Sequence, residues 1–316
     1  MKATALVIGR EIVATLATLL VASVVVFGLF AILPGDPAVL LANRGGNMVT
    51  PESIAAARRE LGLDRPLPVR YAGWLAGVLR GDLSRSWASG APVRDLLGQR
   101  IGPTLLLGST VLVSGALLSI LLGGLAGLHP NGVIDRATRV LSVTGSGFPA
   151  FLLCLMTLRF VVLGLGRGQV IADGTVHTLS LPAAVGALSL TAFWVRPFRA
   201  LVRDALATDW ALACRARGAS NQRLLIDHAL PNALLGFLPL LGLGLAGVLA
   251  GSIVIEYVFS WPGLGPFIID SIKRRDLPVV QGFALISTAF FVISTQLTNR
   301  VSWYLDPNRR PPGGAA

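Results

Sequence analysis

Charged residues are scarce in this chain. Only 14% of its 316 residues are Asp, Glu, Lys or Arg, whereas 53% are hydrophobic. A soluble domain carries about 25% charged residues, so the composition argues against an ordinary water-soluble enzyme. The net charge of +11 does not indicate nucleic-acid binding either, because the basic residues are scattered between long uncharged stretches and do not gather in one patch.

Several signatures of catalysis and metal binding are missing as well. Cys154 and Cys214 are the only cysteines, so the sequence offers no disulfide framework and no cysteine-rich metal site. The two lysines, Lys2 and Lys273, do not follow a glycine, which excludes the Gly-Lys-Ser/Thr loop of an ATPase. Zinc-protease helices and Gly-x-Ser-x-Gly elbows are also lacking. We therefore expect that this chain is not an enzyme, binds no cofactor or metal and does not hydrolyse ATP.

Six uncharged stretches are long enough to cross a membrane. At about 1.5 Å per helical residue, each can span a hydrocarbon core of about 30 Å. We therefore predict an all-α, polytopic membrane protein with six transmembrane helices. None of the six stretches contains Asp or Glu, which disfavours a proton-coupled secondary carrier, although a carrier or channel remains a remote alternative. The predicted spans are Ile12–Gly35, Ile101–Asn131, Val140–Leu158, Gly174–Val195, Ala229–Ile255 and Leu277–Asn299.

The basic residues of the short loops predict the orientation of the chain. With the N-terminus inside, most of these residues fall on the cytoplasmic side, so both termini are expected to be cytoplasmic. The predicted parts are an N-terminus with the first span (1–35), an external segment (36–100), a five-helix core (101–308) and a disordered tail (309–316). The external segment exceeds the length for which the charge rule holds. Within it, Pro51–Leu61 is predicted to be helical, with Pro opening and Gly62 closing the helix.

Two glycine pairs lie inside predicted spans. Gly123 and Gly127, and likewise Gly247 and Gly251, are separated by three residues. This small-x-x-x-small spacing is typical of closely packed membrane helices, so we expect a packing role for both pairs and no ligand role.

The cytoplasmic loop at 196–232 has a distinctive pattern. Its first half is rich in Ala, Leu and Arg, which predicts a helix that ends at Gly218 in a left-handed turn. Asn221 is expected to cap a second short helix, which Pro231 ends or kinks. Two arginine-rich helices joined by a glycine elbow would form a rigid lever suited to docking a partner protein. The alternative is that these arginines only set the topology and meet anionic lipid.

The spacing within this loop resembles a known motif. Ala213 precedes Gly218 by five residues, and His228-Ala-Leu-Pro-Asn232 follows after nine intervening residues. This pattern is similar to the EAA loop of binding-protein-dependent ABC importer permeases. More narrowly, the chain resembles the first permease subunit of dipeptide, oligopeptide and nickel importers. The similarity runs from the first span almost to Asn308 and includes Leu33–Pro37, Glu60–Pro66, Arg80–Leu83, Ser260–Gly265, Arg274–Asp276 and Pro278–Gly282.

The resemblance implies a type I ABC importer permease fold embedded in lipid of the inner membrane. It also implies pairing with a second, similar permease, two ATPase subunits inside and a substrate-binding protein outside. In the family, the EAA loop seats in a groove of the ATPase and transmits its closure. Leu212 departs from the acid of the broad motif and Cys214 from its alanine. The coupling residues that we expect are Ala213, Arg215, Arg217, Gly218, His228, Leu230, Pro231 and Asn232.

Five residues near the outer ends of the spans are further candidates. Arg159 either extends to the outer membrane surface or lines the translocation path and meets a substrate carboxylate. Trp261, with Pro262 and Gly263, is either a membrane anchor or, as the family resemblance implies, part of an outer gate. Glu256 is either an interface charge or part of that gate. The resemblance implies peptides as substrates, with nickel or a metal chelate as the alternative, although unclustered His and Cys residues give a direct metal path no support.

Overall fold

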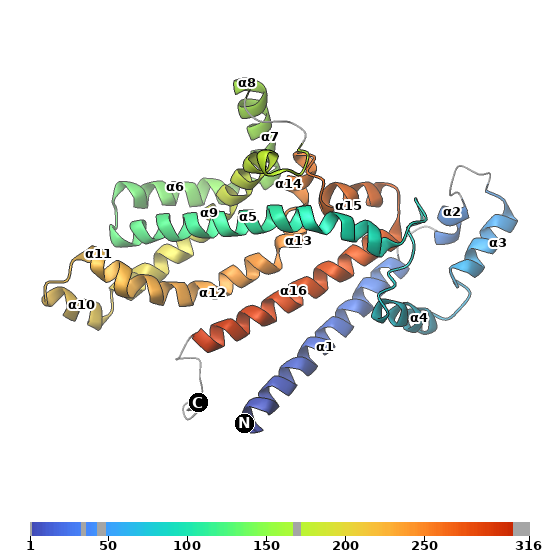
Figure 1. Ribbon diagram of the computed structural model, residues 1–316, viewed down its shortest axis with the longest axis horizontal. Helices are drawn as coiled ribbons and strands as arrows, with labels where there is room; N and C mark the ends of the chain where they lie inside the picture. The colour runs from blue at the N-terminus through green and yellow to red at the C-terminus, as the bar shows by residue number, and fades with distance from the viewer. Residues whose placement is uncertain (1, 33–35, 43–48, 167–171, 306–316) are drawn as a thin grey trace. The chain divides into compact units, whose positions relative to one another are not determined.

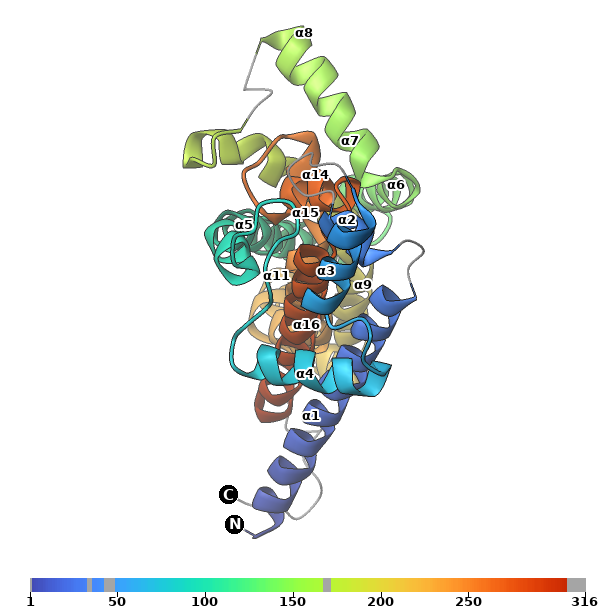
Figure 2. The same cartoon turned by 90° about the vertical axis from the view of Figure 1, so that its right-hand side faces the viewer.

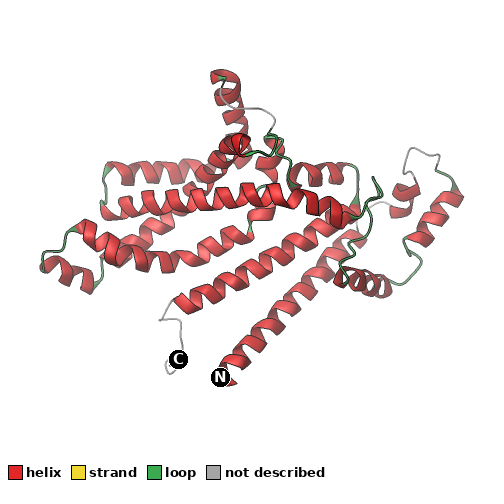
Figure 3. Cartoon of the chain, in the orientation of Figure 1, coloured by secondary structure: helices red, strands yellow, loops and turns green. Residues whose placement is uncertain are grey.

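A computed structural model describes residues 2–32, 36–42, 49–166 and 172–305. Within this part of the chain every regular element is helical, and the only strand-like feature is an isolated bridge between Arg85 and Pro92 (Figure 3). The predicted all-α class is therefore confirmed. The expected tail at 309–316 and the segment Leu33–Gly35 lie outside the described residues.

The helices of Figure 1 are α1 Lys2–Ala31, α2 Pro37–Ala42, α3 Pro51–Glu60, α4 Leu67–Leu79, α5 Val93–Leu128, α6 Val133–Gly147, α7 Ala150–Thr157, η1 Leu158–Val162, α8 Leu163–Leu165, α9 Val176–Leu206, α10 Asp209–Ala216, α11 Asn221–Leu224, η2 Leu225–Ala229, α12 Leu230–Ala246, α13 Val248–Gly251, α14 Ile253–Val258, α15 Leu264–Lys273 and α16 Leu277–Leu305.

Five of these helices are long and apolar enough to cross a membrane, and a sixth span results if one sharply bent helix pair is counted as one. The prediction of spans one, two, four and six is confirmed, with shifted ends. The second helix already begins at Val93, and the fourth continues to Leu206. The five helical segments that are long and apolar enough to cross a membrane are Ile12–Ala31, Val93–Leu128, Val176–Leu206, Asn221–Ala246 and Leu277–Leu305.

The third predicted span, Val140–Leu158, is wrong as a straight helix. α6 ends at Gly147, and the chain turns by 103° into the helical stretch that begins at α7. Figure 2 shows α7 and α8 running away from α6, which is seen end-on. The reason is local: Phe148 precedes Pro149 and adopts an extended conformation (φ −96°, ψ 122°), because the proline ring disfavours helical geometry in the preceding residue.

The fifth predicted span, Ala229–Ile255, is also interrupted. Its main helix, α12, ends at Ala246, and two short helices follow, with Gly247 and Ser252 at the breaks. Gly and Ser stabilise a helix less well than Ala or Leu do, so breaks at these positions cost little. In the other direction, the span continues back through η2 to Asn221.

The chain forms two compact units, of which the first comprises Met1–Gly102 and Gly263–Val292. In this unit α4 lies across α1 (Figure 2). Tyr71 of α4 packs edge-on against Phe27 and shares a hydrogen bond of 2.8 Å with the Ser23 hydroxyl. The predicted helix at Pro51–Leu61 is confirmed as α3, which Thr50 opens with a capping box.

Two buried or half-buried acids tie the loops of the first unit together. The Asp36 carboxylate caps α2 through the amide of Ala38 (2.9 Å) and pairs with Arg58 of α3 (2.5 Å). The Arg58 guanidinium holds the pKa of Asp36 below its ordinary value. Asp276 is 3% exposed and accepts hydrogen bonds from the Ser86 hydroxyl (2.5 Å) and from the amide of Trp87 (2.9 Å). The Arg274–Asp276 stretch thus has a structural role, because it fixes the turn after α4.

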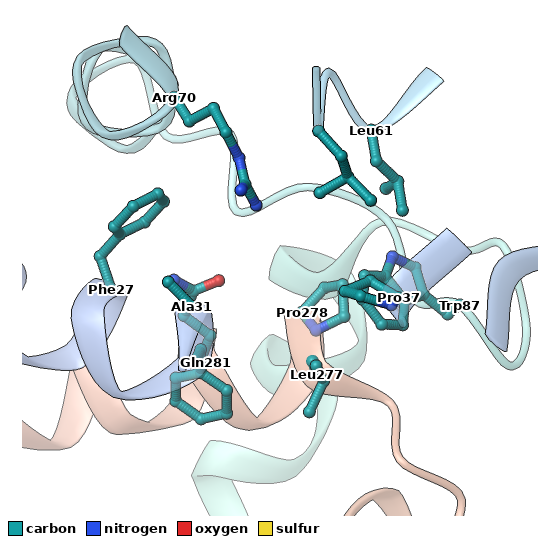
Figure 4. Close-up of a pocket in the computed structure, with 11 residues that line it drawn as sticks. Phe27, Ala31, Pro37, Leu61, Arg70, Trp87, Leu277, Pro278 and Gln281 are labelled. Carbon is teal, nitrogen blue, oxygen red and sulfur yellow. The ribbon is translucent and has the colours of Figure 1, made fainter. Parts of the chain in front are cut away.

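A small cavity of about 100 Å³ lies in the first unit (Figure 4). Arg70 reaches into it from α4, and its other lining is mainly apolar, with Phe27, Leu61 and Pro278 among the residues drawn. Small-molecule sites usually measure about 300 to 1,000 Å³. This cavity can therefore take a single side chain but not a whole peptide.

The second unit comprises Pro103–Pro262 and Ile293–Ala316. Here α5 approaches α9 closely, because a Cβ atom at Gly123 would lie 3.0 Å from the carbonyl oxygen of Val195, and one at Gly127 would lie 2.7 Å from the Val202 side chain. The packing role predicted for this glycine pair is confirmed. The same prediction for Gly247 and Gly251 is wrong: a Cβ at Gly251 meets nothing within 4 Å, and one at Gly247 meets only carbonyl oxygens of the preceding helical turn.

Candidate functional site

The loop at 196–232 begins as a continuation of α9, which ends at Leu206. Thr208 precedes α10 in an extended conformation (φ −74°, ψ 156°). Asp209 occupies the first turn of α10 and Arg215 the last turn. These charges complement the helix dipole, which favours acids at the N-terminus and bases at the C-terminus.

α10 ends as predicted, in a left-handed turn at Gly218 (φ +86°). The amide of Ala219 donates to the carbonyl of Cys214 (3.1 Å), and the amide of Gly218 donates to the carbonyl of Arg215 (2.9 Å). This pair of bonds is the Schellman motif, which satisfies the last carbonyls of a helix and favours glycine at the left-handed position. Gly218 therefore fixes the angle at which the chain leaves α10.

The second half of the loop differs from the prediction in two details. Ser220, not Asn221, caps α11, because its hydroxyl accepts from the amide of Arg223 (3.3 Å). Pro231 does not end the helix, because the preceding residues widen into the π-helix η2 and α12 follows directly. The amide of Leu230 donates to the carbonyl of Leu225 in this wider turn, and Pro231, which has no amide hydrogen to place, follows at the change from η2 to α12. The Asn232 side chain adds a hydrogen bond of 2.9 Å to the carbonyl of His228.

The loop is anchored from within by apolar side chains. Leu224 and Leu225 are buried in a cluster with Phe198, Val202 and Leu206 of α9. Leu230 is half-buried and packs against the same cluster. The remaining expected coupling residues are all exposed: Ala213, Arg215, Arg217, Gly218, His228, Pro231 and Asn232. The loop thus presents a polar and basic surface on a fixed apolar base.

Trp210 also belongs to this surface, although its sequence pattern did not single it out. Its ring packs edge-on against the His228 imidazole, with centroids 5.2 Å apart, and so joins α10 to η2. Trp210, Leu212 and Ile226 are all exposed, the last two by 54% and 58%. The sequence feature that could have indicated Trp210 is the presence of a tryptophan in an arginine-rich loop outside the predicted spans.

The candidates at the outer ends of the spans do not form one cluster of exposed groups. Trp261 is fully buried and donates its indole N–H to the carbonyl of Pro103 (2.9 Å). The interpretation as a membrane anchor is therefore wrong. Glu256 is also fully buried and accepts a hydrogen bond from the Ser252 hydroxyl (2.7 Å), so it is not an interface charge. The amide of Trp261 donates to the carbonyl of Glu256 (2.8 Å), which brings these two candidates together.

The other three candidates are more exposed or lie elsewhere. Pro262 is exposed and lies beside Gly174, where an added Cβ would come within 2.8 Å of its ring. Gly263 precedes α15 and belongs to the first unit. Arg159 is exposed on η1, with its guanidinium 6.0 Å from the ring centroid of Phe160.

Asp173 closes the turn before α9. Its carboxylate accepts hydrogen bonds from the Thr175 hydroxyl (2.7 Å), the Thr175 amide (2.9 Å) and the Thr178 hydroxyl (2.7 Å). These hydrogen bonds lower the pKa of Asp173 to about 2, and the bond from the Thr175 hydroxyl has the largest effect. The negative charge is therefore present throughout the physiological pH range.

Two family models match the chain. Residues 119–311 match the binding-protein-dependent transport system inner membrane component, and residues 5–99 match the N-terminal part of the same membrane component. The first match alone covers more than half of the sequence. The chain belongs to this family of inner-membrane permeases. The loop described above lies inside the first matched region.

Curated relatives and one solved structure agree with the assignment. The permease is 31% identical over 310 residues to the probable peptide ABC transporter permease protein y4tP of Sinorhizobium fredii, a match that covers 95% of this chain and 98% of the relative. It is 34% identical over 285 residues to the glutathione transport system permease protein GsiC of Salmonella typhi, which covers 90% and 92%. A crystal structure of an amino acid ABC transporter with histidines gives a TM-score of 0.53 at 17% identity and covers 66% of this chain and 94% of that chain. This last likeness shows the fold, which is that of an ABC transporter permease.

Proposed function

We propose that this permease forms half of the translocation path of an ATP-driven importer of peptides and is coupled to separate ATPase subunits through the loop at 196–232. Peptide transport is supported by the relatives, one a probable peptide permease and one a glutathione permease. In this assignment the permease itself performs no catalysis. A second permease, two ATPase subunits and an extracytoplasmic binding protein complete the assembly, and both termini of this chain are cytoplasmic.

One observation carries the coupling role. The exposed surface of the loop stands on buried Leu224 and Leu225, and its angle is set by the Schellman turn at Gly218. Because Leu224 and Leu225 pack against the last turns of α9, which extends to Leu206, a push on the loop is passed to the membrane helix through this apolar contact.

Site-directed crosslinking tests this role. A cysteine at Leu212, which is 54% exposed on α10, is expected to crosslink to an ATPase subunit when the permease is purified as the complete transporter. The two native cysteines are first replaced by serine and alanine. A matched cysteine at Arg275, exposed in the turn before α16, is expected to give no such crosslink because it lies on the opposite side in the predicted topology. Capture of the ATPase at Arg275 but not at Leu212 would overturn both the docking site and the orientation.

Arg159 is the candidate for substrate recognition within this function. Its exposed guanidinium on η1 can pair with the carboxylate of an anionic peptide, an interaction of about 1 kcal/mol at an exposed site. Arg159→Leu is therefore expected to lower the uptake of an acidic peptide about fivefold relative to a neutral peptide of equal length. Arg159→Lys keeps the charge and is expected to retain the preference. Equal effects on the two peptides in a competition uptake assay would remove Arg159 from the path.

A further inference from the structure

A charged cluster lies between α6 and α9 in the second unit. Asp135, in the first turn of α6, has a side chain with 0% exposure. Its carboxylate accepts the amide of Asn131 (2.8 Å) and forms ion pairs with Arg199 of α9 and with Arg139 of α6, the latter at 3.3 Å. The side chain of Arg199 is 16% exposed, whereas that of Arg139 is 51% exposed. The Asp135–Arg199 pair is therefore the buried connection between the two helices.

Stability alone does not account for such a pair. Removing two charges from water carries a large desolvation cost, and well-packed apolar residues at the same positions often stabilise a protein equally well or better. The helices α6 and α9 already pack along each other. What the ion pair adds is a link between one point on each helix, because separating the two helices there would leave the Arg199 guanidinium, 16% exposed, without this charge partner.

On the side of α9 that faces α5, the backbone at Arg199 is also closely packed. A Cβ at Gly123 of α5 would lie 3.2 Å from the amide nitrogen of Arg199, and one at Gly127 would lie 3.2 Å from its carbonyl oxygen. Arg199 thus has its backbone against α5 and its guanidinium on α6. A displacement of α9 at this point has to act on α6 through the ion pair.

The position of Arg199 along α9 relates the pair to the coupling loop. Only about 10 Å of helix, at 1.5 Å per residue, separates Arg199 from Leu206, where α9 ends. Pro197 lies two residues earlier and removes one intrahelical hydrogen bond there. Arg199 is therefore on the loop side of the weak point in α9. At its other end, α6 leads through the bend at Phe148 into the helical stretch with Arg159.

We propose that the Asp135–Arg199 ion pair is a positioning element that transmits displacement of the coupling loop from α9 to α6. The bent segment that follows α6 then moves with the loop. This inference rests on the proposed function, since it needs an ATPase that acts on the loop.

The test measures the uptake of a labelled peptide and the hydrolysis of ATP in the same proteoliposomes. These contain the complete membrane assembly, and the peptide and the binding protein are added on the side from which uptake occurs. Asp135→Asn and Arg199→Gln are each expected to lower the amount of peptide taken up per ATP hydrolysed by about tenfold, within the 5- to 150-fold range of typical coupling energies. ATP hydrolysis is expected to persist. Unchanged uptake per ATP hydrolysed in variants that assemble at the usual yield would overturn the proposal.

Three further variants keep the proposal testable if the single variants assemble poorly. Arg139→Gln removes the exposed partner of the same carboxylate and is expected to leave coupling unchanged. Arg199→Lys retains the charge and is expected to recover part of the uptake per ATP. The double variant Asp135→Leu/Arg199→Met replaces the pair by apolar side chains and is expected to restore the yield of the assembly but not its coupling. Normal coupling in this double variant would show that the pair only fills space.

Failure of this inference and failure of the proposed function are distinguishable in one experiment. If no ATPase subunit purifies with the unaltered permease, the proposed function fails. If the unaltered assembly couples uptake to hydrolysis and the Asp135 and Arg199 variants do so equally well, only the inference about the ion pair fails.

Discussion

Replacing Gly218 by valine is expected to abolish ATP-driven uptake while the permease still inserts into the membrane at its usual level. Gly218 has φ +86°, and a Cβ added there would meet nothing within 4 Å. The cost is therefore a matter of backbone conformation, about 1 to 2 kcal/mol for an ordinary L-residue and more for a β-branched one. The chain avoids this strain by leaving the left-handed turn, and the two Schellman hydrogen bonds at the end of α10 are then lost.

The loss of these bonds changes the angle between α10 and the membrane helices without touching the apolar base of the loop. Transport measured with the complete assembly is expected to fall by more than about tenfold, which corresponds to 1.4 kcal/mol of lost coupling. Immunoblots of membranes give the amount of inserted permease. Unchanged uptake by a well-expressed Gly218→Val variant would show that the elbow transmits no force.

Three variants separate the causes of this effect. Gly218→Asn is expected to keep most of the uptake, because Asn tolerates the left-handed conformation better than other non-glycine residues do. Gly218→Asp has nearly the same shape but adds a negative charge beside Arg215 and Arg217, so its failure would assign a role to the basic surface itself. Gly166→Val is the matched control outside the loop, since Gly166 has φ +63° and equally open surroundings, and it is expected to leave coupling intact.

The features of the loop that were predictable from sequence are those set by neighbouring residues. A glycine after an Ala- and Arg-rich run predicts the left-handed end of α10, and the structure has it at Gly218. The break in the third span could also have been anticipated, because Phe148 stands before Pro149 and the residue before proline disfavours helix. Hydropathy hides this break, since both residues are apolar.

Features that depend on tertiary packing could not be read from the sequence. The sequence places Arg199 in the arginine-rich loop at 196–232, and its pairing with Asp135 becomes visible only where α6 lies along α9. The glycine pairs show the same limit. Gly123 packs under α9, whereas Gly251, with the same spacing to its partner, has open surroundings. The spacing of two glycines predicts that they share one face of a helix, but it does not predict which residues pack against that face.

Replacing Trp261 by alanine is expected to be the most destabilising single change in the second unit. Trp261 is fully buried in a cluster with Leu107, Cys154 and Phe259, and its indole N–H donates to the carbonyl of Pro103. Truncating a buried Trp to Ala costs about 3 to 5 kcal/mol, because the apolar contacts are lost and a cavity remains. Trp261→Phe keeps most of the ring and is expected to cost less, about 1 kcal/mol for the lost hydrogen bond together with a smaller packing defect.

The fraction of monodisperse permease that survives heating in detergent measures this difference, and Trp303→Ala supplies the control. Trp303 lies in the same unit but is 39% exposed near the end of α16, so its loss leaves no internal cavity and is expected to lower the midpoint of heat inactivation far less. Peptide uptake by Trp261→Phe then tests the outer gate separately from stability. If this variant is stable but transports poorly, the hydrogen bond between Trp261 and Pro103 contributes to gating, whereas normal transport assigns Trp261 to the folded core alone. Equal heat resistance of Trp261→Ala and Trp303→Ala would contradict the buried position of Trp261.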